Sequence, residues 1–346
     1  MMKVAILSYP MLFQRTGGLQ IQILETIKGL KRLGIDATLI DPNRHKIDQF
    51  DLVHIFACIN GNHRIVETAK AHDVPVVISS LIRKDWTVWQ GVKGRTLSKL
   101  VRKLSNWSII TSYDHIKYCL DTSDRIIALG EFEKVAIASA FRVNSDKIDV
   151  IPNGIPDRFF NRNEQDFRRK TNISSGFVLC VGAISPRKNQ LTIAQALKDS
   201  ALDLVLIGEC LKDQQNYLEQ LNKFNNVHYL GKLHYDDPLL ISAYSSAGVF
   251  CLPSQDEVMP LSVLESLAAG TPVVMTRNHC MDMVGMERIV VEVDPQDIGG
   301  IRAAILNLIS KHIVPMDCQK LVRRYTWDKV AEDIALCYKR ALLKIQ

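Results

Sequence analysis

The chain has 346 residues, 47% of them hydrophobic, and 43 Lys and Arg against 37 Asp and Glu give a net charge of +6. This length exceeds the usual size of one hydrophobic core, so two domains are expected. The sequence has neither a run of about 18 apolar residues nor a secretory pattern at its start, which predicts a cytoplasmic chain without a spanning helix. The positive charge suits anionic partners, either nucleotide diphosphates or acidic lipid headgroups, and does not choose between them.

The cysteines also indicate a cytosolic protein. Eight of them are scattered singly, mostly inside apolar runs, and no Cys-x-x-Cys spacing occurs: Cys58, Cys119, Cys180, Cys210, Cys251, Cys280, Cys318 and Cys337. This pattern predicts reduced thiols, and it excludes a disulfide framework or a cysteine zinc site.

Short β-branched runs alternate with helical segments along the chain, a pattern typical of parallel sheets covered on both faces. The first half predicts strands at 4–8, 37–41, 52–56, 76–79, 125–128 and 148–151. The second half predicts strands at 177–181, 204–207, 227–230, 249–252, 273–276 and 289–291. We therefore expect an α/β protein made of two Rossmann-like, doubly wound parallel-sheet domains in series.

The two domains are expected to meet near residues 151–156, because two prolines and an Asn-Gly pair interrupt regular structure there. The predicted domains are 1–155 and 156–324. A last helix is expected to begin near Thr326, a plausible N-cap, and it carries Trp327, Val330, Ile334 and Tyr338 at helical spacing.

The most informative segment is 252–274, which reads as strand, loop, helix and strand. Pro260 suits the first helical position and Gly270 the position just past the end, while Leu261, Leu264, Leu267 and Ala268 form a buried stripe. Glu257 then lies just before the helix and Glu265 in its second turn.

Two glutamates with seven residues between them could bracket a ligand at this helix N-terminus. The unpaired N–H groups there favour a diphosphate or a sugar oxygen, and a carboxylate can accept hydrogen bonds from vicinal hydroxyls. The alternative is that Glu257 only complements the helix dipole and that Glu265 is solvated surface.

A second candidate site follows the strand at 177–181. Arg187 and Lys188 are adjacent cations at the carboxyl end of that strand, where open sheets bind ligands. When a diphosphate departs from a substrate, negative charge builds on it, and fixed cations lower that barrier. We interpret these two residues as leaving-group stabilisers, with an ordinary exposed basic turn as the alternative.

Two features of the first half are weaker. Gly17 and Gly18 follow the first strand and precede an amphipathic helix through Ile23, Ile27 and Leu30; they either let backbone approach phosphate closely or form a plain turn. The dinucleotide fingerprint Gly-x-Gly-x-x-Gly is missing there, which argues against a dehydrogenase. His54 ends a buried strand and is either a hydrogen-bonded structural histidine or a residue that lines a cleft.

These motifs resemble those of glycosyltransferase family 4. Ser254, Glu257, Leu261, 263–265 and 269–274 resemble its Glu-x7-Glu signature, and 182–189 resembles its Gly-x-x-x-Pro-Arg-Lys-Asn loop. The resemblance covers nearly the whole chain, from the loop at 15–20 to the last helix.

The resemblance implies the GT-B architecture, in which two Rossmann-like domains face each other across a cleft and the last helix, here 325–346, crosses back onto the N-terminal domain. It also implies retaining hexosyl transfer, with catalytic Arg187, Lys188 and Glu257 and with Glu265 on the nucleotide ribose. Further residues of both domains are expected to bind the donor: Gly17, Gly18, Asn153, Gly208, Leu261 and Ser262. Asp-x-Asp motifs and metal-ligand clusters are absent from the sequence, which agrees with metal-independent transfer and no cofactor.

The sequence departs from the family pattern at three places. Val258, Met259 and Pro260 stand where glycines are usual, Ala183 stands where an arginine is common, and no histidine follows the strand at 76–79. Pro260 has no N–H to donate, which changes the donor-sugar contacts available there. On the acceptor side, the residues that could line the pocket are His54, Lys84, Asp85 and Trp86.

Residues 93–107 form a basic amphipathic segment, with Leu97, Leu100, Val101, Leu104 and Trp107 apolar and Lys99, Arg102 and Lys103 opposite. This pattern suits a helix on an anionic membrane surface, which would favour a lipid-linked acceptor. The alternative is a helix packed on the N-terminal sheet with a solvated basic face.

We therefore expect a retaining glycosyltransferase that uses a UDP- or GDP-linked sugar and a glycan or lipid-linked acceptor, in surface polysaccharide or lipopolysaccharide synthesis. No nucleic-acid partner is expected. Two alternatives remain: a nucleotide-sugar epimerase of the same architecture, and a non-catalytic sugar-nucleotide-binding scaffold subunit.

Overall fold

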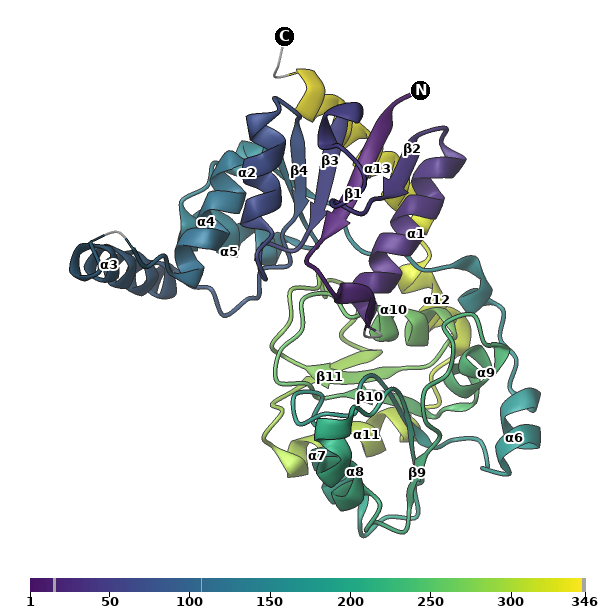
Figure 1. Ribbon diagram of the computed structural model, residues 1–346. Helices are drawn as coiled ribbons and strands as arrows, with labels where there is room; N and C mark the ends of the chain where they lie inside the picture. The colour runs from purple at the N-terminus through teal and green to yellow at the C-terminus, as the bar shows by residue number, and fades with distance from the viewer. Residues whose placement is uncertain (15–16, 107, 344–346) are drawn as a thin grey trace. The chain divides into compact units, whose positions relative to one another are not determined.

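The computed structural model describes residues 1–14, 17–106 and 108–343, and the chain forms two compact units (Figure 1). The N-terminal unit comprises Met1–Gly154, Cys280–Asp282 and the residues from Trp327 onward. The C-terminal unit comprises Ile155–His279 and Met283–Thr326. The short segment at Cys280 is one that the sequence analysis had placed with the C-terminal domain.

The N-terminal unit is built on a six-stranded parallel sheet of order β2-β1-β3-β4-β5-β6. Its strands are β1 (Lys3–Ser8), β2 (Asp36–Leu39), β3 (Leu52–Phe56), β4 (Val76–Ser79), β5 (Arg125–Ala128) and β6 (Ile148–Val150). All residues of β3, β4 and β5 are buried, as expected for central parallel strands with both faces covered.

Helices cover this sheet, and short 3₁₀ turns complete the part of the unit that the structure describes. The helices are α1 (Gly18–Arg32), α2 (His63–Ala71), α3 (Val88–Leu104), α4 (Ser112–Thr122), α5 (Glu131–Phe141) and α13 (Trp327–Leu342). The 3₁₀ turns are η1 (Leu12–Gln14), η2 (Ile47–Gln49) and η3 (Ser145–Lys147). The last helix, α13, packs against α1, β4 and β5, and it buries the predicted Trp327, Val330, Ile334 and Tyr338. Residues 344–346 of the predicted crossing helix lie outside the described residues.

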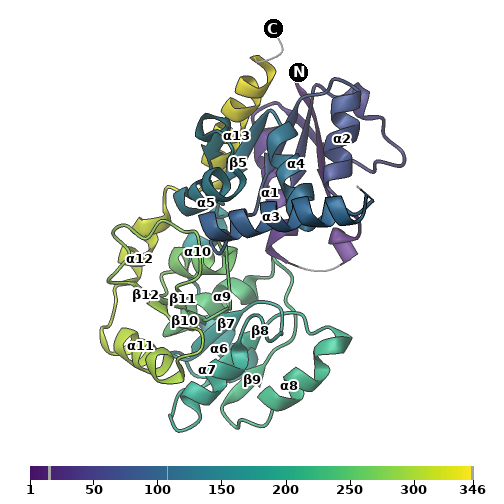
Figure 2. The ribbon, with the colours of Figure 1, turned by 90° about the vertical axis from the view of Figure 1, so that its left-hand side faces the viewer.

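The C-terminal unit has a second six-stranded parallel sheet, of order β12-β11-β10-β7-β8-β9 (Figure 2). Its strands are β7 (Val178–Val181), β8 (Leu204–Ile207), β9 (Val227–Tyr229), β10 (Val249–Leu252), β11 (Val273–Thr276) and β12 (Val290–Val293). Its helices are α6 (Gln165–Thr171), α7 (Gln190–Leu197), α8 (Gln215–Leu221), α9 (Pro238–Ser246), α10 (Leu261–Ala268), α11 (Ile298–Ser310) and α12 (Pro315–Val322). Two 3₁₀ turns, η4 (Asp157–Phe160) and η5 (Lys212–Gln214), accompany them.

The two parallel sheets confirm the predicted fold class, and all twelve predicted strands occur within two residues of their expected ends. One detail of the helix prediction was wrong. Pro260 is the residue before α10, in an extended conformation with φ −69° and ψ 123°, and the helix begins at Leu261. Gly270 does follow the helix with φ +82°, a left-handed conformation that glycine adopts without strain.

One alternative for residues 93–107 was a helix packed on the N-terminal sheet. Helix α3 does not pack in this way. It contacts α5 and α4, and its leucines at positions 97, 100 and 104 are exposed to solvent. Trp107, at the end of the predicted amphipathic segment, lies outside the described residues. Among the residues that the structure describes, no helix is both long and apolar enough to cross a membrane.

Candidate active site

The candidate active site lies at the carboxyl edge of the C-terminal sheet. Strands β7 and β10 are neighbours, with Leu179 opposite Phe250. From β7 the chain continues to β8 on one side, whereas from β10 it continues to β11 on the other. The loops at 182–189 and 253–260 therefore leave the sheet side by side, at the position where doubly wound sheets bind their ligands.

These two loops are joined by ion pairs. Lys188 Nζ lies 2.5 Å from Glu257 Oε1, and the two side chains are only 18% and 9% exposed. The more exposed Arg187 donates to Asp256 Oδ1 at 2.7 Å. The sequence had predicted the cations and Glu257 separately and had missed their pairing. The signal was available, because opposite charges follow two strands that a doubly wound order makes adjacent.

Side chains of the first loop fix its shape. Asn189 has φ +62°, a conformation that asparagine tolerates, and its amide donates to Pro253 O at 3.0 Å and to Pro295 O at 2.7 Å. The next residue, Gln190, is fully buried and donates to Ala183 O at 2.9 Å. Lys188 is therefore carried on a loop that is tied to its neighbours before any ligand binds.

Gly208, predicted as a donor contact, has a structural reason to be glycine. It follows β8, and a Cβ atom there would lie 1.9 Å from Gly182 O in the loop after β7. The close approach of the two backbones leaves no room for a side chain. Whether Gly208 also contacts a donor stays a prediction.

Helix α10 presents its N-terminus to the same edge of the sheet. Pro260 supplies no side-chain cap, and the N–H groups of Leu261 and Ser262 open the helix. The first N–H groups of a helix, together with its dipole, favour an anionic group. This geometry agrees with the predicted donor contacts of Leu261 and Ser262, which stay predictions.

Glu265 lies inside α10 and is buried, with 4% of its surface exposed. The Tyr244 hydroxyl donates to Glu265 Oε2 at 2.8 Å. Burial raises the pKa of Glu265 to about 7, and hydrogen bonds from Tyr244 and Tyr235, with the nearby Arg158 charge, act in the opposite direction. The alternative of a solvated surface glutamate is therefore wrong, whereas the contact with ribose stays a prediction.

The neighbours of Glu265 were missed by the sequence analysis. Tyr244 comes from α9, and Arg158 comes from η4 and stacks on the Tyr235 ring at 4.6 Å from its centroid. These residues lie far apart along the chain and belong to no local motif, so only the tertiary structure brings them together.

The remaining predicted donor residues belong to the N-terminal unit. Gly17 is extended and precedes α1, which begins at Gly18, and Asn153 is buried in the segment that ends this unit. Arg15 and Thr16, which complete the glycine-containing motif, lie outside the described residues. The predicted roles of Gly17, Gly18 and Asn153 stay predictions.

His54 is the predicted acceptor-side residue that the structure places most clearly. It is fully buried in β3, and its Nδ1 and Nε2 atoms lie 2.7 Å from Tyr338 Oη and 2.9 Å from Ser79 Oγ. Burial lowers its pKa to about 3, so the ring is neutral. The structure thus favours the hydrogen-bonded structural histidine and corrects the assignment of His54 to a pocket wall, since no surface is left for an acceptor.

Lys84, Asp85 and Trp86 form part of the loop after β4. Lys84 Nζ lies 5.0 Å from the centre of the Phe132 ring, and Asp85 pairs with Arg83 at 3.2 Å. The Trp86 ring packs on Phe141 at 4.7 Å between centroids. Their roles toward an acceptor stay predictions.

A buried carboxylate that the sequence analysis missed holds the start of this loop. Glu133 in α5 accepts hydrogen bonds from Ser80 Oγ at 2.6 Å and from the N–H groups of Ile82 and Leu129, both at 2.7 Å. Burial raises the pKa of Glu133 to about 7, although these hydrogen bonds act to lower it.

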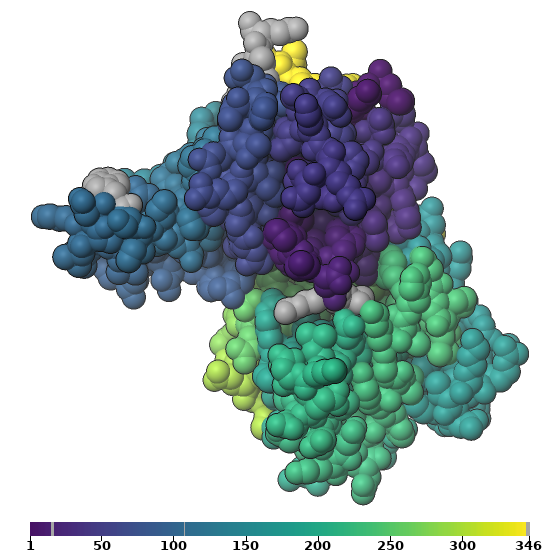
Figure 3. Space-filling model, in the orientation of Figure 1, coloured from purple at the N-terminus to yellow at the C-terminus, as the bar shows by residue number. Residues whose placement is uncertain are grey.

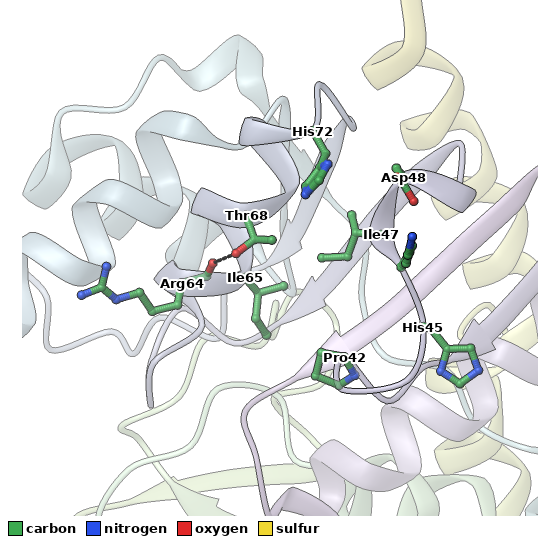
Figure 4. Close-up of a pocket in the computed structure, with 9 residues that line it drawn as sticks. Pro42, His45, Ile47, Asp48, Arg64, Ile65, Thr68 and His72 are labelled. Atoms are coloured by element: carbon green, nitrogen blue, oxygen red, sulfur yellow. Dashed lines mark hydrogen bonds between the residues drawn. The ribbon is translucent and has the colours of Figure 1, made fainter.

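The N-terminal unit also has a surface pocket of about 510 Å³ between the loop at 42–48 and α2 (Figure 4). Residues at its wall include His45, Arg64 and His72, and Thr68 donates to the Arg64 carbonyl at 2.9 Å. The pocket contains none of the predicted site residues. Within the described ranges, no group of three or more His, Cys, Asp or Glu side chains is arranged to hold a metal ion.

Comparison with known proteins shows that the chain is similar to glycosyltransferases. Residues 161–324 match the family model of glycosyl transferases group 1, and this segment contains the paired loops and α10. The chain is 28% identical over 241 residues to an uncharacterized glycosyltransferase of Methanocaldococcus jannaschii, a match that covers 64% of this chain and 61% of the relative.

A second relative has an assigned activity. The chain is 27% identical over 270 residues to the UDP-Gal:alpha-D-GlcNAc-diphosphoundecaprenol alpha-1,3-galactosyltransferase of Escherichia coli, covering 73% of this chain and 65% of that protein. The matches to these two relatives therefore span less than two thirds of their lengths.

Solved structures confirm the fold. The crystal structure of HepE from Anabaena in complex with UDP aligns with a TM-score of 0.71 and 15% identity, covering 98% of this chain and all of that one. The chain is thus homologous to glycosyltransferases and has the two Rossmann-like domains of the GT-B class. The comparisons thus confirm the resemblance to glycosyltransferases and the GT-B fold that the motifs had indicated.

Proposed function

We propose that the protein is a retaining glycosyltransferase that moves a hexose from a UDP- or GDP-linked sugar to a glycan or glycolipid acceptor in the synthesis of a surface polysaccharide or lipopolysaccharide. The observation that carries the proposal is the nearly buried Lys188–Glu257 pair at the switch point of the C-terminal sheet, inside the segment that matches the family model. The roles below follow from the charges of these residues.

The donor diphosphate binds where the two loops and the N-terminus of α10 converge. Lys188 and Arg187 bring positive charge to a pre-formed loop, and Leu261 and Ser262 offer N–H groups. The bond between the anomeric carbon and the diphosphate oxygen breaks, and the charge that develops on that oxygen is stabilised by these donors. Glu257 holds the Lys188 ammonium in place and offers its other oxygen to a donor-sugar hydroxyl.

The acceptor hydroxyl attacks the anomeric carbon on the face that the diphosphate leaves, which retains the anomeric configuration. Its oxygen forms the new glycosidic bond, and its proton passes to the departing phosphate oxygen. No protein nucleophile is required. The proposed role of Glu265 is to bind the nucleotide ribose, because its carboxyl group is already positioned by the Tyr244 hydroxyl.

Two comparisons support the choice of substrates. The E. coli relative is named for a UDP-linked galactose donor and a GlcNAc-diphosphoundecaprenol acceptor, and HepE was solved with UDP. A uridine nucleotide and an acceptor on a polyprenyl diphosphate are therefore the first pair to test. We further propose that transfer needs no metal ion and takes place in the cytoplasm, at the inner face of the membrane.

The proposal is tested by incubating the protein with UDP- and GDP-linked hexoses and a sugar-diphospho-polyprenol acceptor, with and without EDTA. We expect a glycosylated acceptor and one released nucleoside diphosphate per transfer, unaffected by EDTA. Lys188→Met is expected to lower transfer by about 10²–10³, whereas Lys198→Met, a matched change at an exposed lysine after α7, is expected to leave it intact.

The same assay separates the alternatives. An epimerase would release an altered nucleotide sugar in the absence of acceptor, and a scaffold subunit would bind the nucleotide sugar without any turnover. Either result would contradict the proposed transfer activity.

A further inference from the structure

Helix α3 is fixed to the N-terminal unit by its polar side. Arg95 donates to Ala140 O at 2.6 Å, Ser98 donates to Asp114 Oδ1 at 2.6 Å, and Arg102 pairs with the same carboxylate at 2.7 Å. The buried residues of this 17-residue helix are Gly91 and Ser98. A helix of a soluble protein normally turns its apolar stripe inward, so α3 is oriented in the reverse sense.

The outward side of α3 carries a continuous apolar stripe. Trp89, Leu97, Leu100 and Leu104 recur at helical spacing and are 66%, 56%, 53% and 78% exposed. Ile109 and Ile110, shortly after the helix, are also exposed. In the space-filling view the segment forms a projection on the N-terminal unit (Figure 3). Exposed apolar residues scattered singly need no explanation, whereas a contiguous stripe marks an interaction surface.

Cations border this stripe and no acidic residue lies among them. The helix has five basic residues, Lys93, Arg95, Lys99, Arg102 and Lys103, and no Asp or Glu. Arg95 and Arg102 turn inward to the contacts described above, whereas Lys93, Lys99 and Lys103 are exposed. The Lys93 ammonium lies 5.9 Å from the centre of the Trp89 ring, so this cation and the apolar stripe are on the same side of the helix.

We propose that the stripe and its lysines, the α3 docking surface, bind an anionic phospholipid bilayer, with Trp89, Leu97, Leu100 and Leu104 entering the interface and Lys93, Lys99 and Lys103 contacting the headgroups. Apolar and cationic groups on one exposed helix side fit such an interface. A second copy of the chain fits poorly, because a two-fold interface would bring two copies of this basic surface together, and α3 supplies no acidic partner to either.

The α3 docking surface gives the protein a further partner, the membrane. Binding to the membrane does not require the proposed transfer activity, but its use in bringing the protein to a lipid-linked acceptor rests on that proposed function. The loop with Lys84, Asp85 and Trp86 runs directly into α3 through Thr87, whose side chain caps the helix at Gln90 N. The predicted acceptor-side residues are therefore carried on the segment that enters α3, which suits an acceptor whose lipid stays in the membrane.

The test is sedimentation of the full chain with vesicles of phosphatidylcholine alone and of phosphatidylcholine mixed with phosphatidylglycerol. One variant replaces three leucines, Leu97→Gln, Leu100→Gln and Leu104→Gln, and a second reverses two charges, Lys99→Glu and Lys103→Glu. The apolar control is Val284→Gln, Leu306→Gln and Met316→Gln, three exposed positions of the C-terminal unit. The charge control is Lys198→Glu and Lys223→Glu, two other exposed lysines.

We expect the wild-type chain to bind the mixed vesicles about tenfold or more better than neutral ones, since each lysine near an anionic surface strengthens binding several-fold. Both α3 variants should lose most of this binding, and both controls should keep it. Trp89 adds a local readout: its emission should shift to the blue on vesicles, and Trp89→Phe should remove that shift. Nucleotide binding by the α3 variants should equal that of the wild type, which shows that they are folded.

Equal binding by the wild type and both α3 variants would overturn the proposal. A wild-type dimer in solution that the leucine variant converts to a monomer would also overturn it, in favour of a second copy of the chain. Vesicle binding requires no turnover, so a failed transfer assay leaves this result unaffected, and a failed vesicle assay leaves the proposed transfer chemistry unaffected.

Discussion

The two units use the same sheet architecture in different ways at the carboxyl ends of their strands. In the N-terminal unit, His54 within β3 and Glu133 beside the loops after β4 and β5 are fully buried and have their hydrogen-bond partners inside the protein. His54 is bound to Tyr338 and Ser79, and Glu133 accepts from three donors in two loops. In the C-terminal unit, Lys188 and Glu257 form an ion pair that keeps part of its surface exposed.

Both sheets therefore have polar side chains near the ends of their strands, but only side chains that stay exposed and charged can contact a ligand there. A group such as His54, which is fully buried with both ring nitrogens bound inside the protein, stabilises the fold and cannot meet a substrate. A partly exposed cation held by one carboxylate can exchange contacts with an arriving diphosphate. The same substitution should therefore affect stability in one unit and turnover in the other.

The largest effect is expected from Glu133→Ala. It leaves the N–H groups of Ile82 and Leu129 buried without their acceptor, and it leaves the Ser80 hydroxyl with only its longer bond to Ile127 O. The unfolding free energy should therefore fall by about 3–5 kcal/mol. Chemical denaturation measures this change. The matched substitution Glu257→Ala, at the C-terminal sheet, should lower stability less, by about 1–3 kcal/mol, because the Lys188 side chain that loses its partner is 18% exposed and can reach water. Its main effect should be on transfer. Equal stability losses would contradict the comparison.

Lys188→Met should lower kcat by about 10²–10³, or roughly 3–4 kcal/mol of transition-state stabilisation, because the departing diphosphate loses a fixed cation. Its thermal stability should stay close to that of the wild type. A loss of stability without a loss of turnover at saturating donor would assign Lys188 a structural role like that of His54.

The pH dependence of Glu265→Gln sharpens the comparison inside the C-terminal unit. Glu265 has a pKa of about 7 when folded, above its ordinary value of 4.5, so the folded state keeps a proton that the unfolded chain has lost. Its contribution is fully present below pH 4.5 and is lost as the pH rises to about 7. The stability of the glutamine variant relative to the wild type should therefore rise by up to about 3 kcal/mol between pH 4.5 and 8. A pH-independent difference between the two proteins would contradict the raised pKa.

Tyr338→Phe tests the buried histidine of the N-terminal unit. The substitution removes the hydroxyl 2.7 Å from His54 Nδ1 and should cost about 1–2 kcal/mol, because a buried polar atom loses its partner. Tyr118→Phe, at an exposed position of α4, is the control and should be neutral within about 0.5 kcal/mol. The two substitutions are compared by thermal unfolding, and an equal effect would remove the assigned role of Tyr338.

The smallest effect on stability is expected from Leu100→Ala in α3. The residue is 53% exposed, so its truncation should change the unfolding free energy by less than about 0.5 kcal/mol. Leu120→Ala, at a fully buried position of α4, should cost about 2–5 kcal/mol. A large cost at Leu100 would mean that the leucine packs inside the unit in solution.

The sequence predicted the strands and the charged loops well because both are local. Buried parallel strands are short β-branched runs, and the loop with Arg187 and Lys188 follows one of them directly. The partnership of Lys188 with Glu257 depends on strand order, and the contact of Glu265 with Tyr244 depends on packing between α10 and α9. Periodicity also found the amphipathic character of α3, but it could not show that the polar side is the one turned inward.

The central claim is that the paired loops of the C-terminal sheet bind the diphosphate of a nucleotide sugar. Calorimetric titration of UDP and GDP into the wild type, Lys188→Met and Lys198→Met tests it most directly. One nucleotide should bind the wild type and Lys198→Met alike and should bind Lys188→Met at least about tenfold more weakly. Undiminished binding to Lys188→Met, or no binding of either nucleotide to the wild type, would contradict the account.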